Sequence, residues 1–356
     1  MTQRERVIAT VLGRKTDSIP FLMPFGPWGE TLERWKTEGY DGADFNRLIG
    51  ADTVFVPVGG VNLGLCPAFT PRVLEERGDK RLVVDDKGVT QLVTLDHDTI
   101  PAYLDYPVKC REDWERMKYR FDPDAAGRIA PAGPTVPAGD YIVQLGWYPY
   151  GLFGTARDLM GVETLLLTFY DDPALIEDIM TTLTDLWLAV YERVCRTVRV
   201  DCIHMWEDMS GCHGPLISPA MIDAFMVPQY KRIRAFCDAH DIPIFSLDTD
   251  GDCSRLLPSL IEAGVNLVYP FEVAAGSDLT AIKRQYPTQF CAMGGIDKRE
   301  VAKGRAAIDR ELARIRPALD YPAVIPALDH LFHPEISFSD FLYFNERLKA
   351  LCHHEL

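Results

Sequence analysis

The segment IPIFSLDTDGDCSRLLPSLIEAGVNLVYPFE, residues 242–272, combines two strand patterns with one helix pattern. The runs at 242–247 and 266–271 are short, apolar and rich in β-branched or aromatic residues, which is typical of buried strands. Between them, residues 253–264 place apolar side chains at helical spacing. A strand, a helix and a second strand in this order predict a parallel pair of strands covered by helices.

The same order recurs along the chain. Apolar runs alternate with longer helical segments, and two of these segments begin with an N-cap followed by proline, at Asp172–Pro173 and at Ser218–Pro219. About eight such units predict a single (β/α)8 TIM barrel of the α/β class. We also expect an N-terminal helical extension and an early strand at 19–25. The other predicted strands lie at 53–58, 141–146, 202–207, 242–247, 266–271, 290–295 and 323–328.

One segment departs from this alternation. Residues 80–95, KRLVVDDKGVTQLVTL, contain two alternating runs around Asp-Lys-Gly, a pattern that predicts a β-hairpin. A connection rich in Ala, Pro and Gly follows at 125–140. We therefore predict one domain, residues 1–356, with an excursion at 66–138 that carries the hairpin.

The charge balance excludes several classes of function. The chain has 37 basic and 52 acidic residues among 356, which gives a net charge of −15. Nucleic acid is excluded as the main ligand, because phosphate backbones are bound by clustered positive charge. The first residues lack the apolar core of a signal peptide, and no apolar run is long enough to cross a membrane, so we expect a cytoplasmic protein. Nine scattered cysteines without a CxxC pair are typical of free thiols.

Ionisable residues follow five consecutive predicted strands. The carboxyl ends of barrel strands meet at the face where active sites form, so we expect these side chains to converge. Carboxylates with a histidine can hold a divalent metal or act as general acids and bases, and the pattern leaves both open. Each of these residues could instead cap a helix or lie in a solvated loop. Asp252, for example, is placed to cap the predicted helix at 253–264. The residues are Glu207, Asp208, Asp248, Asp250, Glu272, Asp297, Asp329 and His330.

Aromatic residues mark a second part of the expected site. The segment GWYPYGLFG, residues 146–154, follows a predicted strand and could wall an apolar pocket, with core packing as the alternative. We predict substrate contacts from Trp147, Tyr148 and Tyr150, together with Glu272. The phosphate-binding motifs GxGxxG and GxxxxGK[ST] are absent, as are the hydrolase motif GxSxG and the protease motif HExxH.

Five segments of the chain resemble, in order and spacing, the uroporphyrinogen decarboxylase superfamily. That superfamily forms a single-domain (β/α)8 barrel and includes the haem-pathway decarboxylase, cobalamin-independent methionine synthase and methyltransferases that act with corrinoid proteins. The resemblance extends over nearly the whole chain and implies the same fold. The segments are TQRERVIATVLGRKTDSIPF (2–21), SPAMIDAFMVPQYKRI (218–233), DGDCSRLLPSLIEAGVNLVYPFE (250–272), GGIDKREVAKG (294–304) and IPALDHLFHPEISFSDFLYFNERL (325–348).

Within the superfamily, the chain resembles the methyltransferase branch more than the decarboxylase itself. The haem-pathway decarboxylase has an MRQAGRY motif that holds substrate carboxylates, whereas the matching stretch FLMPFGPWGETLERW (21–35) has no arginine before Arg34. Without that charge-assisted clamp, uroporphyrinogen decarboxylation is rejected. The resemblance implies transfer of a methyl group between a small methylated compound, a methyl ether or methylamine, and the corrinoid cofactor of a separate protein.

The resemblance also implies a site for zinc or another divalent metal. Coenzyme M methyltransferases of the superfamily bind zinc through a His-x-Cys-Gly motif and a late cysteine, and Asp248, Asp250 and His330 occupy these positions here. The change from sulfur to oxygen and nitrogen ligands disfavours thiol activation but permits metal binding. The predicted metal ligands, Glu207, Asp248, Asp250 and His330, are also the predicted catalytic residues.

Two other classes of function stay open. A metal-free decarboxylase or lyase acting on a small carboxylic acid would use the same carboxylates for proton transfer, without a corrinoid. A non-catalytic barrel would bind a cationic ligand at its acidic mouth. A structural alternative for Asp248 or Asp250 is an ion pair with an arginine such as Arg299. The sequence leaves the substrate, the metal and the formation of a homodimer undecided.

Overall fold

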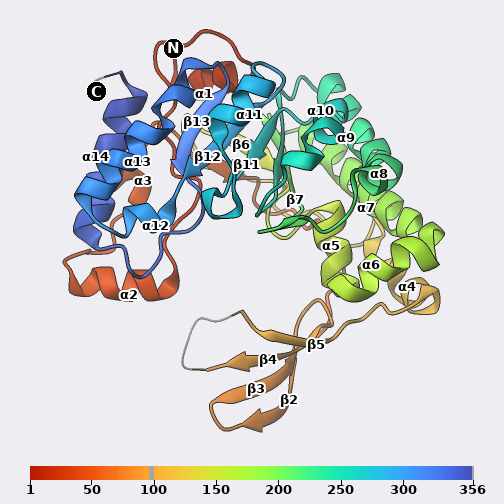
Figure 1. Ribbon diagram of the computed structural model, residues 1–356. Helices are drawn as coiled ribbons and strands as arrows, with labels where there is room; N and C mark the ends of the chain where they lie inside the picture. Colours follow the sequence, from red (N-terminus) through yellow and green to blue (C-terminus); the bar gives the residue numbers. More distant parts are fainter. Residues whose placement is uncertain (96–99, 355–356) are drawn as a thin grey trace.

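The computed structural model describes residues 1–95 and 100–354, and its largest element is a curled sheet of seven parallel strands (Figure 1). The strands follow one another in the order β1-β6-β7-β10-β11-β12-β13, so each lies beside its successor in this sheet, as in repeated βαβ units. Each of the seven predicted runs from 53 onward overlaps one of them, and β10 and β12 extend one residue past the predicted end. They are β1 (Phe55–Pro57), β6 (Ile142–Leu145), β7 (Cys202–Trp206), β10 (Ile244–Asp248), β11 (Leu267–Tyr269), β12 (Cys291–Ile296) and β13 (Val324–Leu328).

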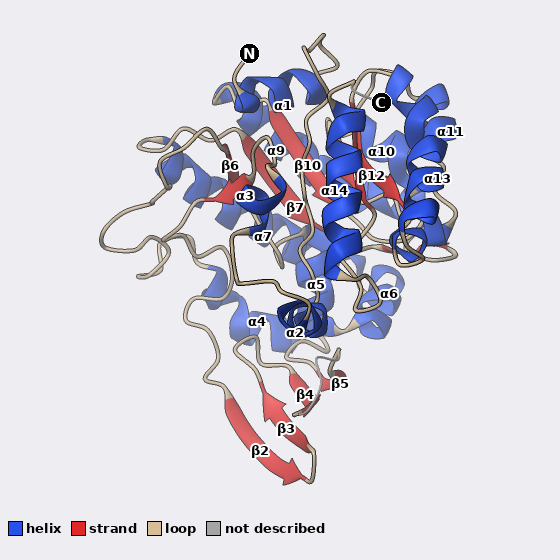
Figure 2. Ribbon diagram, turned by 90° about the vertical axis from the view of Figure 1, so that its left-hand side faces the viewer, coloured by secondary structure: helices blue, strands red, loops and turns tan. Residues whose placement is uncertain are grey.

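Helices pack around the outside of the curled sheet (Figure 2). The first three form the N-terminal extension that the sequence predicts. The helices are α1 (Gln3–Val11), α2 (Gly29–Thr37), α3 (Phe45–Ile49), α4 (Arg111–Met117), α5 (Leu152–Met160), α6 (Val162–Asp171), α7 (Pro173–Cys195), α8 (Pro219–Met221), α9 (Val227–Ala239), α10 (Leu257–Glu262), α11 (Leu279–Gln285), α12 (Lys298–Val301), α13 (Arg305–Ile315) and α14 (Phe338–Cys352).

Two helix starts confirm the capping prediction. The Asp172 side chain accepts a hydrogen bond from the backbone N–H of Leu175 at the start of α7, and Ser218 accepts one from Met221 at the start of α8. The segment after Ser218 is not one regular helix, because a π-helical turn at Ile222–Met226 separates α8 from α9. Pro228 in the first turn of α9 lacks the N–H that a regular helix would use here.

The amino ends of the strands are closed by apolar packing. The first residues of five strands form one buried cluster with side chains of α1. The cluster includes Val7, Val11, Leu22, Ile142, Cys202, Ile244, Leu267, Cys291 and Ile325. In barrel folds the site lies at the opposite end, at the carboxyl ends of the strands.

The expected early strand at 19–25 is not formed, and that prediction is wrong. Pro20 and Pro24 have no backbone N–H to donate to a strand ladder. Two hydrogen bonds hold the segment instead. The Phe21 N–H donates to the Asp52 carboxylate, and the Asp52 N–H donates to the Phe21 carbonyl oxygen. Among the described residues no strand pairing joins β13 to β1, so the sheet is curled but open at these two edges.

The segment between β1 and β6 forms a separate four-stranded antiparallel sheet that projects from the rest of the molecule (Figure 1). Its central strands pair in register from Lys80 with Thr94 to Val84 with Thr90, where the sequence predicts a hairpin. Bridges from Gly59 to Thr135 and from Val61 to Ile129 bring the chain back to β6. The strands are β2 (Arg72–Arg77), β3 (Lys80–Val84), β4 (Thr90–Thr94) and β5 (Ala102–Asp105), and a separate small ladder joins β8 (Ser210–Gly211) to β9 (Gly214–Pro215).

All nine cysteines are free thiols, as the sequence predicts. In the part of the chain that the structure describes, no helix has the length and apolar character needed to cross a membrane.

Candidate active site

A cavity of about 570 Å3 lies at the carboxyl ends of the strands. This volume suits a small organic substrate. The wall is mostly apolar and aromatic, and its few polar groups converge from different strands. Its lining includes Phe25, Trp147, Tyr148 and Trp206 among the aromatic residues, and His204, Asp248, Asp250 and His330 among the ionisable ones.

Two of the three predicted aromatic residues line this cavity. Trp147 and Tyr148 follow β6 and are 48% and 58% exposed, so they lie at the rim. The Tyr148 ring meets the Trp206 ring edge to face, with centroids 4.7 Å apart. Tyr150 lies elsewhere, because it lines a smaller neighbouring cavity of about 370 Å3 between α5 and the hairpin turn. The turn of the chain at Pro149 thus divides the predicted aromatic set between two cavities.

Asp250, Glu272 and His330 form a cluster at the cavity mouth. One ligand atom from each of these residues lies within 4.8 Å of the others. His330 Nε2 is 3.5 Å from Asp250 Oδ2. The His330 ring stacks on Phe25, with centroids 5.6 Å apart, which fixes the plane of the imidazole. The three side chains follow β10, β11 and β13, so three separate strand ends build the cluster.

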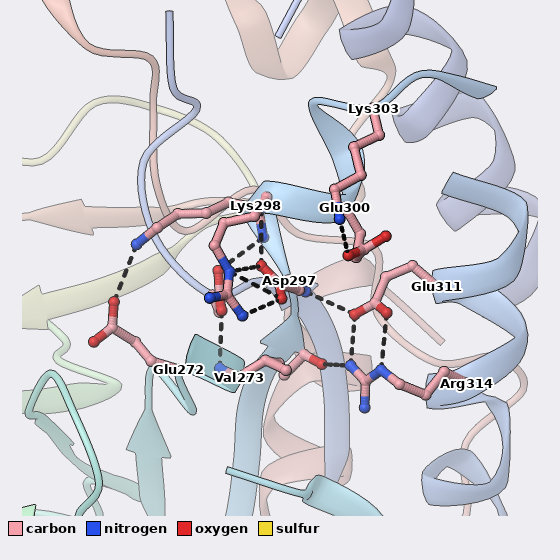
Figure 3. Close-up of polar contacts among 11 residues, drawn as sticks. Glu272, Val273, Asp297, Lys298, Glu300, Lys303, Glu311 and Arg314 are labelled. Atoms are coloured by element: carbon pink, nitrogen blue, oxygen red, sulfur yellow. Dashed lines mark hydrogen bonds and ion pairs between the residues drawn. The ribbon is translucent and has the colours of Figure 1, made fainter. Parts of the chain in front are cut away.

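Glu272 is held by two contacts besides the cluster. Lys298 Nζ lies 3.1 Å from its Oε1, and the backbone N–H of Gly251 donates to its Oε2 at 2.9 Å. Figure 3 shows the lysine reaching across to this carboxylate from the start of α12. The contact with Gly251 ties Glu272 to the Asp250 loop, so the two carboxylates are positioned relative to each other.

Asp248 lies deeper in the same cavity. The residue is 7% exposed, and among the described residues its carboxyl group makes no hydrogen bond or ion pair. Burial, and then the nearby carboxylates of Asp250, Asp208 and Glu272, raise the pKa of Asp248 well above its ordinary value. The group is therefore suited to holding or donating a proton toward a ligand.

Glu207 is not part of the cluster, although the sequence groups it with the metal ligands. Its side chain is fully buried at the start of α5, where its oxygens accept hydrogen bonds from the backbone N–H groups of Leu152 and Phe153 at 2.9 and 2.6 Å. Gly154 N–H adds a longer bond of 3.3 Å, and the Tyr230 hydroxyl donates at 2.6 Å. Both oxygens are occupied by these donors. The four predicted metal ligands therefore do not form one cluster. Glu272 is the third member of the cluster beside Asp250 and His330.

The remaining strand-end carboxylates have structural partners. Asp297 forms a bidentate pair with Arg299, so the proposed pairing of Arg299 with Asp248 or Asp250 is wrong. Asp329 accepts hydrogen bonds from the backbone N–H groups of Val273 and Lys298, and burial raises its pKa to about 6. These contacts join the loops after β11, β12 and β13 into one network (Figure 3).

Asp208 and Asp252 also make local contacts. Arg157 of α5 donates to the Asp208 carboxylate at 2.6 Å. Asp252 accepts hydrogen bonds from the backbone N–H and the hydroxyl of Ser254, two residues further on. The N-cap residues of the 3-10 turn at Ser254–Leu256 and of α10 are Cys253 and Leu256, and neither start has a side-chain cap, so the predicted capping role of Asp252 is wrong.

His204 is a cavity residue that the sequence did not single out. It lies in the middle of β7, is 4% exposed and bonds Ser246 Oγ through Nδ1 at 2.9 Å. Burial lowers the pKa of His204 to about 3, so the imidazole is neutral near pH 7. In the sequence, His204 differs from its neighbours only as one polar residue within an apolar strand. Many residues of protein cores show the same pattern.

The chemistry of the cluster fits a divalent metal. Two carboxylates and one imidazole from three loops match the three-ligand set of catalytic zinc sites, in which a fourth position stays open for water or substrate. Oxygen and nitrogen donors also suit other divalent ions. Asp250, Glu272 and His330 would hold the ion. If Glu272 used Oε1 as its ligand atom, Lys298 would have to give up its contact with that oxygen.

Comparison with known proteins identifies the family. The sequence model described as uroporphyrinogen decarboxylase (URO-D) matches residues 150–350, which is more than half of the chain. The chain belongs to the uroporphyrinogen decarboxylase family. No curated protein sequence matches this family member significantly.

Solved structures agree with the fold. A methyltransferase from Methanosarcina mazei is 15% identical to this URO-D family member, with a TM-score of 0.61 over 100% of this chain and 99% of that one. At this identity the likeness shows a shared fold. A B12-independent methionine synthase from Shewanella sp. gives a TM-score of 0.41 at 10% identity, over 95% of both chains, and we draw nothing from this weaker match.

Proposed function

We propose that this member of the URO-D family is a methyltransferase. It would transfer a methyl group between a small methylated compound, a methyl ether or methylamine, and the corrinoid cofactor of a separate protein. The observation that carries the proposal is the position of the Asp250, Glu272 and His330 cluster at the mouth of an aromatic-walled cavity. The shared fold with a protein named a methyltransferase and the family resemblance support it.

The described residues divide into three roles. Trp147 and Tyr148 at the rim would hold the methylated compound and exclude water from the transferred group. Asp250, Glu272 and His330 would hold a divalent metal, which supplies a Lewis acid beside the bound compound. Asp248 would face the departing heteroatom and hold or donate the proton that an alkoxide leaving group requires.

A decarboxylase or lyase acting on a carboxylic acid fits this cavity less well. Enzymes that hold a substrate carboxylate commonly use arginine or lysine for it, because a charge-assisted hydrogen bond offsets the loss of solvation. Among the described lining residues of the cavity neither residue type occurs. The wall does offer neutral donors, such as the Gln144 amide and the His204 imidazole.

The test is methyl transfer to free corrinoid. Purified protein would be supplied with zinc and reduced cob(I)alamin, and with a panel of methyl ethers, methylamines and small carboxylic acids. Formation of methylcobalamin is followed by its absorption spectrum, and release of carbon dioxide is measured in parallel. We expect protein-dependent methylcobalamin from at least one methyl donor and none from the Asp250→Ala/His330→Ala variant.

The controls are Asp252→Ala and His333→Ala. They change the same residue types close by but outside the cluster, and they should keep the activity of the unaltered protein. Carbon dioxide release without any methylcobalamin would overturn the proposal in favour of the decarboxylase.

A further inference from the structure

The cavity has no lysine or arginine side chain in its wall, as far as the described residues show. Basic side chains on neighbouring elements are paired with carboxylates. Arg157 pairs with Asp208 at 2.6 Å, Lys298 pairs with Glu272 at 3.1 Å, and Lys87 pairs with Asp158. Away from the Asp250, Glu272 and His330 cluster, the wall therefore offers no lysine or arginine to an anionic ligand.

The same wall offers two groups that attract cations. Aromatic faces stabilise an ammonium group by about 0.5–2 kcal/mol each, depending on how far it is removed from water. Trp147 presents a large exposed ring at the rim. The other rings already have neighbours at a face, because Lys87 Nζ lies 5.8 Å from the Tyr148 centroid, Phe25 stacks on His330 and Tyr269 stacks on His204. A group that carries several methyl substituents on a charged nitrogen matches such a wall in both shape and charge.

Asp248 supplies an independent observation. Asp248 is 7% exposed, lines the cavity and makes no side-chain hydrogen bond or ion pair among the described residues. A quaternary ammonium group has no N–H to donate, so it would be attracted to this carboxyl group through its charge alone.

We propose that the methyl donor of this cavity is a quaternary ammonium compound rather than a methyl ether, an inference that rests on the proposed methyl transfer. The carbon–nitrogen bond breaks with its electron pair left on nitrogen, so a neutral tertiary amine leaves and no proton is needed. The electron pair of the reduced corrinoid forms the new bond to the methyl carbon. Asp250, Glu272 and His330 would hold a divalent metal, which would supply a Lewis acid for an oxygen substituent of the donor.

The experiment compares choline with its uncharged isostere 3,3-dimethylbutan-1-ol. Binding to the full chain is measured by isothermal titration calorimetry at fixed zinc content, with tetramethylammonium as a second cation. We expect choline to bind at least about tenfold more tightly than the isostere, which corresponds to about 1.4 kcal/mol. Equal or tighter binding of the isostere would overturn the inference, as would no binding of either cation at millimolar concentration.

Two variants locate the effect. Asp248→Asn should reduce the preference for choline to about twofold or less, while Asp252→Asn on the same loop should leave it unchanged. If Asp248→Asn fails to fold, Trp147→Leu at the exposed rim serves instead, and it should weaken choline binding more than isostere binding. A preference for choline that survives both the Asp248 and the Trp147 changes would contradict the assignment to this cavity.

Methyl transfer is measured separately with choline that carries deuterated methyl groups. Methyl transfer from ethers, combined with no binding of choline, would overturn this inference and leave the proposed function standing. Tight choline binding without methyl transfer from any donor would overturn both this inference and the proposed function.

Discussion

At the scale of single residues, the carboxylates at the strand ends have separate tasks. Asp250 and Glu272 face His330, whereas Glu207 binds the start of α5 and Asp297 binds Arg299. The sequence shows that a carboxylate follows each of five strands, but it does not show which donor each one meets. That choice depends on backbone N–H groups of other loops, which have no signature in the residue types themselves.

Glu207→Ala should destabilise the protein strongly. The change leaves buried N–H groups of Leu152 and Phe153 and the Tyr230 hydroxyl without an acceptor. We expect a loss of about 3 kcal/mol or more in the free energy of unfolding, measured with urea. Glu335→Ala, whose side chain is largely exposed, should change stability by less than about 0.5 kcal/mol. Equal stability of the two variants would contradict the structural role.

Glu207 should also make stability depend on pH. Burial raises the pKa of Glu207 from its usual 4.5 to about 6, so the folded protein keeps a proton that the unfolded chain loses in this interval. The stability that Glu207 contributes through this pKa difference is therefore fully present below pH 4.5 and is lost as the pH rises through 6.

Glu207→Gln removes this titration. Its cost in unfolding free energy should be about 2 kcal/mol larger at pH 4.5 or below than at pH 7, as urea unfolding at the two pH values would show. All other groups titrate in both proteins and cancel in the difference. A cost that does not change with pH would show that the carboxyl group titrates normally.

At the scale of elements, the alternation of strands and helices was predictable because apolar runs and capped helical segments repeat. Ser218 and Asp172 start their helices where the N-cap and proline pattern indicates. The stretch 19–25 was misjudged because its apolar composition resembles a strand, while its prolines prevent ladder pairing. The division of the aromatic segment between two cavities was not predictable, since it depends on how β6 leads into α5.

Gly154 tests the contact between α5 and β7. In an isolated helix, alanine is favoured over glycine by about 1 kcal/mol. Here a Cβ atom on Gly154 would lie 2.4 Å from the carbonyl oxygen of Trp206. We expect Gly154→Ala to lower the free energy of unfolding by about 2 kcal/mol, measured by chemical denaturation.

Gly26→Ala is the matched control, because a Cβ atom there meets no atom within 4 Å. It should leave stability nearly unchanged. A stabilising effect of Gly154→Ala would mean that α5 lies further from β7 than described.

At the scale of the whole molecule, apolar packing closes one end of the curled sheet and leaves a cavity at the other. The fold class and the location of the site at the carboxyl ends of the strands followed from the repeated βαβ order. The place of Glu272 as third member of the cluster did not follow from this order. Glu272 becomes a partner of Asp250 only through the Gly251 contact between two loops. His204 and the four-stranded projection likewise acquire their places only in the folded chain.

The central claim is that Asp250, Glu272 and His330 form one metal centre at the mouth of the cavity. Its most direct test is the zinc content of the purified protein by inductively coupled plasma mass spectrometry, after supply of zinc and removal of unbound metal. The account predicts close to one zinc per chain in the unaltered protein and in the Asp252→Ala and His333→Ala controls. It predicts loss of zinc in Asp250→Ala/His330→Ala and in Glu272→Ala. No zinc in the unaltered protein, or equal zinc in all variants, would contradict it.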